Sequence, residues 1–273
     1  MQIGEENKGE FRTYSFLREE RSQFQGFRNE NYIEAELKVT FLTAEDGVSV
    51  FKVEMPFYKQ SNKESVYEWV GDLHELRSEI ICTLNEEGYL GKIINLHEIR
   101  NKWEQMKPDV IKKHKDEAHK QIFISGIDEL FEDEERFALA LRYAMPYLML
   151  FPGIVFKEFK KDVVSEGYRE LPNFLAAKNV PIITEEKLTQ LESGQYQIDI
   201  KGDIDEEKFE QDKVTAMIRI LKNRPRVPTQ LKLQYMERYL LEDWPWSEQS
   251  MCMSLAEIPG TLYREEKNIL KAL

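Results

Sequence analysis

The alternation of apolar and polar residues over residues 33–41 (IEAELKVTF) predicts a half-buried β-strand with one face in water. Residues 43–47 then form a short loop that ends in Asp46-Gly47, a hairpin turn signal. The returning stretch alternates too, but its apolar residues change parity near Val50-Phe51, so we expect a β-bulge there. The earlier stretch Phe11–Leu17 predicts a further strand.

Helical spacing dominates the middle of the chain. Residues 63–77 place apolar side chains on one face at intervals of three and four, and predict a helix. A second hairpin over residues 80–94 follows. Asn95 is then expected to cap a helix that Pro108 ends or kinks, and residues 109–123 resume the helical pattern.

The segment Phe137–Phe156 is hydrophobic nearly all round, with Arg142 as its single charge, in a chain that is 32% charged. Such a segment must be enclosed by the rest of the protein, a partner, a ligand or lipid. Its length suits a membrane span, but Arg142, Pro146 and Pro152 interrupt it. We therefore expect no membrane span, and a buried helix that is broken near Met145-Pro146.

Strand patterns return in the C-terminal part after a short helix that is expected at residues 184–191. They cover residues 196–200, 214–220, 231–241 and 251–255, and a Pro259-Gly260 turn precedes a final short strand. The whole pattern predicts an α+β fold, in which antiparallel β-hairpins and meanders at both ends pack with a central, mostly helical block. Residues 1–156 would hold the N-terminal β-hairpins and the helical block, and residues 157–273 the mainly antiparallel β region. One continuous domain is the alternative.

Composition narrows the function classes. The formal charge is −12 and the pI is near 5.1, so the surface repels phosphate backbones and we expect no nucleic-acid partner. Two distant cysteines, Cys82 and Cys252, give no disulfide framework and indicate a reducing compartment. The first sixteen residues lack the apolar core of a secretory signal, so we expect a cytoplasmic protein.

Motifs that carry chemistry are absent from the sequence. It contains no nucleotide-binding glycine loop and no nucleophile elbow, and His114 and His119 stand five apart rather than at the four-residue spacing of a zinc pair. The carboxylate-rich residues 199–207 do not match the order of a calcium loop. Cys82 is expected to be buried, whereas Cys252 is expected on the opposite, more exposed side of its strand. We therefore predict no cofactor and no metal, and assign no catalytic residue.

Four aromatic residues are the candidate interaction site. Trp244 and Trp246 flank a proline on what resembles a hairpin tip, and Tyr235 and Tyr239 lie on the preceding strand. Exposed rings at a rigid turn are effective interface anchors. The alternative is that these rings fold back and close the end of the core.

These features favour a non-catalytic interaction or assembly subunit, with a protein partner or a second copy of the chain. The first alternative is a carrier for an apolar small molecule, because a cavity that is rich in Met and Phe adapts to such ligands. The second alternative is an enzyme whose site is built from scattered Asp, Glu and His. A sheet around an apolar helix is also similar in outline to lipoprotein-carrier and START-like folds, an analogy that no residue motif carries. A carrier predicts an apolar pocket beside Phe137–Phe156, a subunit predicts an exposed apolar patch, and an enzyme predicts titratable groups that converge in a cleft.

Overall fold

A computed structural model describes residues 7–24, 26–45, 48–63, 66–114, 120–154, 156–175, 178–223, 226–241 and 246–273. Strands make up 50% and helices 28% of the structure. Within the described residues, hydrogen bonding orders eleven strands into one antiparallel sheet, as β5-β4-β3-β2-β1-β11-β10-β9-β8-β7-β6. The expected α+β class with a central helical block is therefore wrong. The helices in the middle of the chain are mostly short, whereas many strands run for ten residues or more.

Contacts within the chain group it into two units. Unit 1 contains Met1–Phe16, Ile33–Lys157 and Ala272–Leu273, and unit 2 contains Leu17–Tyr32 and Glu158–Lys271. The boundary expected at residue 156 from the sequence stays a prediction.

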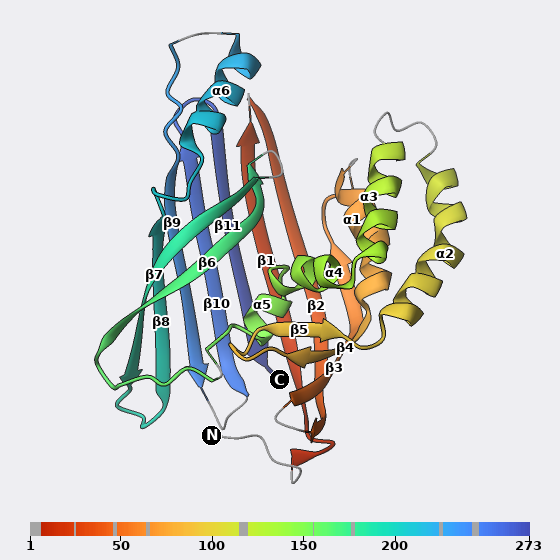
Figure 1. The fold of residues 1–273 in the computed structure, drawn as a ribbon, viewed down its shortest axis with the longest axis vertical. Helices are drawn as coiled ribbons and strands as arrows, with labels where there is room; N and C mark the ends of the chain where they lie inside the picture. Colours follow the sequence, from red (N-terminus) through yellow and green to blue (C-terminus); the bar gives the residue numbers. More distant parts are fainter. Residues whose placement is uncertain are drawn as a thin grey trace. The chain divides into compact units, whose positions relative to one another are not determined.

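Unit 1 combines strands with most of the helices (Figure 1). Its elements, some of which continue into unit 2, are β1 (Phe11–Phe24), β2 (Phe27–Glu45), β3 (Val48–Gln60), α1 (Val66–Asp72), the 3₁₀ helix η2 (Leu73–Arg77), β4 (Glu79–Leu84), β5 (Leu90–Ile93), α2 (Leu96–Lys113), α3 (Lys120–Glu132), α4 (Glu134–Arg142) and α5 (Tyr147–Leu150).

The hairpin of β2 and β3 has a bulge beside Val50-Phe51, as predicted, but the extra residue is on β2 and not on the returning strand. Phe41 pairs with Phe51, and the next pair is Thr43 with Val50, so one residue of β2 has no counterpart on β3. The rings of Phe41 and Phe51 meet edge to face at 5.4 Å between centroids, and Phe51 lies 5.3 Å from Phe151. These rings join the sheet of unit 1 to the end of the apolar segment.

The apolar segment is broken where the sequence predicted. Helix α4 ends at Arg142, the Met145-Pro146 peptide is cis, and α5 begins at Tyr147. Tyr147, Leu148 and Met149 are all buried. No helix among the described residues is both long enough and apolar enough to span a membrane.

Two expectations about α2 need correction. Asn95 is its N-cap residue, but its side chain makes no cap hydrogen bond. The Asn95 amide instead accepts the backbone N–H of Ile81 at 2.8 Å and donates to the carbonyl of Glu79 at 3.2 Å, so it joins the helix start to β4. Pro108 does not end the helix, which continues to Lys113.

Unit 2 is dominated by long strands. Besides its share of β1 and β2, it contains β6 (Val164–Leu175), β7 (Lys178–Gln190), β8 (Tyr196–Ile204), α6 (Gln211–Lys222), β9 (Lys232–Leu241), β10 (Ser247–Ile258) and β11 (Leu262–Ala272).

Two elements of unit 2 differ from the prediction. The helix expected at residues 184–191 is part of β7, and buried polar residues at Thr184 and Glu186 hid its alternation. The strand expected at residues 214–220 is α6. Val214 and Ile218, one helical turn apart, are buried, whereas Ile220 is 78% exposed.

Glycine lets the strands of unit 2 pack closely around Thr184. Gly167 on β6 pairs with Thr184 on β7, which pairs in turn with Gly202 on β8. A Cβ on Gly167 would lie 2.1 Å from Oε1 of Glu186, and one on Gly202 would lie 2.4 Å from a methyl carbon of Ile182. The two missing side chains therefore make room for buried groups on β7.

Candidate functional site

Helix α4 separates two cavities within unit 1. The polar cavity, of about 680 Å³, is lined by Asn85, Gly91, Lys92, Ile93, Asp133, Glu134, Glu135, Arg136, Ala138, Leu139 and Arg142. The apolar cavity, of about 250 Å³, is lined by Val70, Leu73, Leu76, Arg77, Ile127, Leu130, Phe131, Phe137, Ala140, Leu141 and Ala144. Neighbouring residues of α4 thus face different cavities: Leu139 lines the polar one and Ala140 the apolar one.

The start of α4 is fixed by its own sequence. Asp133 is the N-cap residue, and its carboxylate accepts the backbone N–H of Arg136 at 3.0 Å. Glu134 and Glu135 occupy the first turn, where negative charge complements the helix dipole. Helix capping therefore accounts for this acidic cluster.

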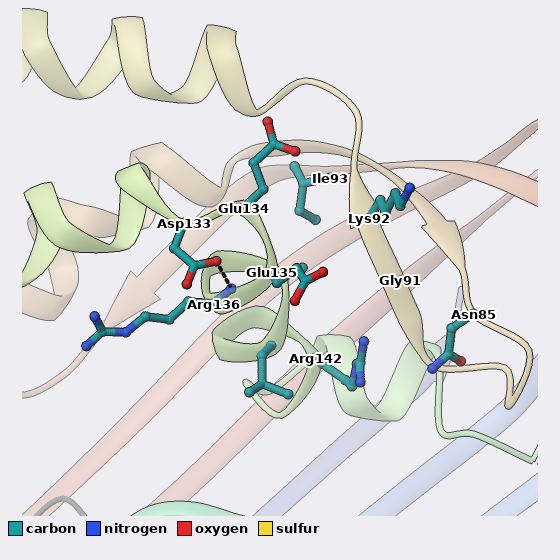
Figure 2. Close-up of a pocket in the computed structure, with 11 residues that line it drawn as sticks. Asn85, Gly91, Lys92, Ile93, Asp133, Glu134, Glu135, Arg136 and Arg142 are labelled. Atoms are coloured by element: carbon teal, nitrogen blue, oxygen red, sulfur yellow. Dashed lines mark hydrogen bonds between the residues drawn. The ribbon is translucent and has the colours of Figure 1, made fainter.

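Figure 2 shows the polar cavity between the first turn of α4 and strand β5, which carries Gly91 and Lys92. Nε of Arg142 donates to the carbonyl oxygen of Leu90 at 2.8 Å and so holds the C-terminal end of α4 against β5. A Cβ on Gly91 would lie 2.9 Å from Oγ1 of Thr83, so a side chain here would press on the neighbouring strand. The cavity offers charges of both signs. No group of three or more His, Cys, Asp or Glu side chains in the described part of the chain is arranged to hold a metal ion.

The apolar cavity is built from α1, η2, α3, α4 and the residue Ala144 that follows α4. Five of its side chains are buried, and the rings of Phe131 and Phe137 stack with centroids 5.1 Å apart. The other apolar side chains of the lining are partly exposed or, for Ala140, exposed. The cavity therefore has a buried apolar base and is open to solvent at Ala140.

Arg77 is the only charged residue among the described residues that line the apolar cavity. Its backbone carbonyl accepts the hydroxyl of Tyr147 at 2.9 Å, and burial raises the pKa of Tyr147, so this donor stays protonated. Burial also lowers the pKa of the neighbouring His74, as does the charge of Arg77. The Arg77 guanidinium makes no hydrogen bond or ion pair within the part of the chain that the structure describes. It is half-buried and chemically uncommitted.

Three of the four aromatic candidates from the sequence are described, and they lie in unit 2. Trp244 lies outside the described residues. Tyr235, Tyr239 and Trp246 are buried, with at most 7% of each residue exposed. Their burial favours the alternative in which these rings close the core, and the interaction role assigned to the four residues stays a prediction.

Tyr235 and Tyr239 converge on a buried carboxylate. The Tyr235 hydroxyl donates to Oε1 of Glu237 at 2.5 Å, and the Tyr239 hydroxyl donates to Oε2 at 2.6 Å. Nε of Arg169 donates to Oε1 of Glu237 at 2.9 Å, and Nη1 of Arg169 lies 3.6 Å from Oε1 of Glu186. Arg169, Glu186 and Glu237 are each at most 4% exposed. We call these five residues the buried polar network.

Cys252 lies against this network, which corrects the expectation that it faces outward. It is 2% exposed, and its Sγ lies 3.7 Å from Oη of Tyr235. Burial raises the pKa of the Cys252 thiol, and the charge of Glu237 adds to the effect. Burial likewise raises the pKa of both tyrosines well above its usual value. These groups stay protonated, act as donors and are closed to solvent, which suits a structural role.

Sequence reasoning missed Arg169, Glu186 and Glu237. One signal was available: Glu237 occupies an inward position in the alternation of β9, between Tyr235 and Tyr239. A charged residue in such a position requires a buried partner, although the sequence does not identify that partner. Arg77 gave no signal, because it ends an ordinary amphipathic helical pattern.

Comparison with known proteins finds similarity only among solved structures. No protein-family model matches the chain, and no curated protein sequence matches it. Among solved structures, the chain is similar to one described as lipid-protein interactions in lipovitellin, at 10% sequence identity and a TM-score of 0.44. The similarity covers 97% of this chain and 25% of the other, so this chain spans about a quarter of the length of that protein.

Proposed function

We propose that this protein is a non-catalytic binding protein that holds an apolar small molecule in the apolar cavity. The observation that supports the proposal is the lining of the cavity, since ten of its eleven residues are apolar. Apolar surface in contact with water costs about 25 cal/mol per Å², so an apolar occupant is favoured there. The cavity lies beside the apolar segment, where the carrier hypothesis expects it.

The size of the cavity limits the ligand. A volume of 250 Å³ holds roughly eight groups of the size of a water molecule, each of which takes about 30 Å³ in the liquid. An alkyl chain of about eight carbons therefore fills it. Each further methylene group would lie outside the cavity and add little to the binding free energy.

The test is the binding of neutral straight-chain alcohols, from hexanol to dodecanol, to the full chain, measured by calorimetry. We expect one saturable site, with an affinity that rises about fourfold per methylene up to about eight carbons and then levels. Ala140→Phe should fill the cavity and weaken binding at least tenfold. Leu139→Phe, on the adjacent position that faces the polar cavity, is the matched control and should leave binding unchanged.

Absence of saturable binding, or equal effects of the two variants, would exclude the apolar cavity as the ligand site. Native mass spectrometry of freshly purified protein, with a denatured control, provides an independent test. A small mass that disappears on denaturation identifies a bound molecule, and its fragmentation gives the compound.

An interaction or assembly subunit is our second proposal, and large exposed apolar side chains support it. Phe27 on β2, Ile122 on α3 and Ile220 on α6 are each more than 70% exposed. Where such side chains form a contiguous patch, the patch marks a protein interaction site. Sedimentation velocity over a hundredfold range of concentration tests self-association, and a single species of monomer mass would leave only a different protein as partner.

A further inference from the structure

We infer that the ligand of the apolar cavity is an amphiphile with a carboxylate head group, and that Arg77 binds this carboxylate. The inference rests on the function proposed above, and adds the charge and chemical class of the ligand. It is carried by the juxtaposition of one uncommitted guanidinium and ten apolar residues around a single cavity.

The first argument is the state of Arg77 itself. Two other cations of the helical region have carboxylate partners: Nζ of Lys107 lies 2.8 Å from Asp128, and Nζ of Lys113 lies 2.7 Å from Asp72. Arg77 has no such partner in the described part of the chain, although it is half-buried. Partial loss of hydration makes an unpaired cation unfavourable, and an anion supplied by a ligand would offset that cost.

The second argument is the charge balance at the cavity. Among the described residues, no carboxylate lines the apolar cavity, so none of them competes there with a ligand for Arg77. The pKa of His74 is lowered, first by burial and then by the charge of Arg77, so this imidazole is neutral near pH 7. Arg77 is the described cation that lines the cavity, and an anionic head group complements its charge.

The third argument is that Arg77 is held in place. The Tyr147 hydroxyl fixes its backbone carbonyl at 2.9 Å, and Tyr147 itself is fully buried. Nζ of Lys102 donates to the carbonyl of Glu75 at 2.8 Å in the same 3₁₀ turn. A guanidinium on a fixed backbone presents its planar donors to a carboxylate in the two-bond geometry that lysine does not offer.

The experiment compares two probes with the same chain, sodium octanoate and 1-octanol, by calorimetry on the full-length protein at pH 7.5. We expect octanoate to bind about tenfold more tightly than octanol, since hydrogen bonds to an ionised partner are the stronger kind. Arg77→Met should weaken octanoate binding about tenfold and leave octanol binding unchanged. Arg77→Lys should recover part of the lost octanoate affinity, because lysine keeps the positive charge but lacks the planar N–H donors of the guanidinium.

Arg136→Met is the matched control, because Arg136 lines the polar cavity on the other side of α4 and its loss should affect neither probe. Retained octanol binding shows that the Arg77 variants are folded. If wild type binds both probes equally, or if Arg77→Met leaves their ratio unchanged, the carboxylate inference is wrong and the proposed function stands. If neither probe binds, both fail.

Discussion

Arg169 and Glu237 form an ion pair inside the sheet of unit 2, with Nε of Arg169 2.9 Å from Oε1 of Glu237. Arg169 lies on β6 and Glu237 on β9, and β7 and β8 lie between them in the strand order. In a flat sheet, strands three apart are separated by about 14 Å. The contact therefore indicates that the sheet curves toward the face that carries the pair, and Gly167 and Gly202 supply the close packing that this curvature needs.

Glu237→Ala should lower the free energy of unfolding by about 3–5 kcal/mol, because it leaves a buried guanidinium without its main partner. It also removes the acceptor of both tyrosine hydroxyls. Urea denaturation followed by circular dichroism measures the change. Glu185→Ala, at an exposed position on β7, is the control and should change stability by less than about 0.5 kcal/mol. A similar small loss for Glu237→Ala would show that the pair contributes little.

The comparison of sequence and structure shows what periodicity can and cannot resolve. The alternation at residues 33–41 reports burial on one face directly. The parity change near Val50-Phe51 does not, because burial on β3 alternates there without a break and the extra residue of the bulge is Leu42 on β2. Apolar and polar residues also alternate over residues 214–220, yet only Val214 and Ile218 are buried. The same sequence pattern is therefore compatible with a helix and with a strand. In the fold this segment connects β8 and β9, which pair with each other, and no local pattern contains that pairing.

The candidate site shows the same limit. The apolar segment at residues 137–156 predicted a buried, broken helix, and the apolar cavity lies against that helix. Arg77 could not be recognised, because its importance depends on the absence of a partner in space. Glu237 was visible as an acid on an inward strand position, but Arg169 lies 68 residues away along the chain. Partners of this kind require the fold.

Gly153→Ala should destabilise the protein more than the same change at Gly260. Both glycines have a φ of about +70°, so the backbone strain on a new side chain is the same, about 1 kcal/mol. A Cβ on Gly153 would lie 2.1 Å from the ring of Tyr89, whereas one on Gly260 meets nothing within 4 Å. Overpacking should add about 1–3 kcal/mol at Gly153. Thermal unfolding of the two variants measures the difference, and equal losses would mean that the Tyr89 ring moves aside freely.

Asp128→Ala should loosen the pair of helices α2 and α3, which lie side by side in Figure 1. Oδ1 of Asp128 accepts the indole Nε1–H of the fully buried Trp103 at 2.8 Å, and both carboxylate oxygens accept Nζ of Lys107. Loss of the acceptor leaves a buried donor unsatisfied, so we expect a cost of about 1–3 kcal/mol and a changed tryptophan fluorescence spectrum.

Lys107→Met separates the two contributions of Asp128. It removes the partly exposed ion pair and keeps the indole hydrogen bond, so the loss should stay below about 1 kcal/mol and the spectrum should not change. A loss for Lys107→Met as large as that for Asp128→Ala would place the stabilisation in the ion pair instead.

Glu266 should make part of the stability of the protein depend on acid pH. Burial alone would raise the pKa of Glu266, but the charges of Arg18 and Arg264 outweigh it and hold the pKa below its ordinary value of 4.5. Oε2 of Glu266 lies 3.3 Å from Nη2 of Arg18, and Oε1 pairs with Nη2 of Arg264. The folded state therefore binds this proton less readily than the unfolded state. The resulting stabilisation is complete above the unfolded pKa and is lost as the pH falls through the folded pKa.

Glu266→Gln has no proton to bind at this position, so the stability difference between wild type and variant should shrink from about pH 6 to about pH 3. Urea denaturation at a series of pH values measures that difference. Lys267→Gln changes the net charge by one unit on the same strand but removes no acid group, so its difference from wild type should stay constant over this range. A constant difference for Glu266→Gln as well would show that the two arginines do not depress this pKa. In that case Glu266 would stabilise β11 by packing and hydrogen bonding alone.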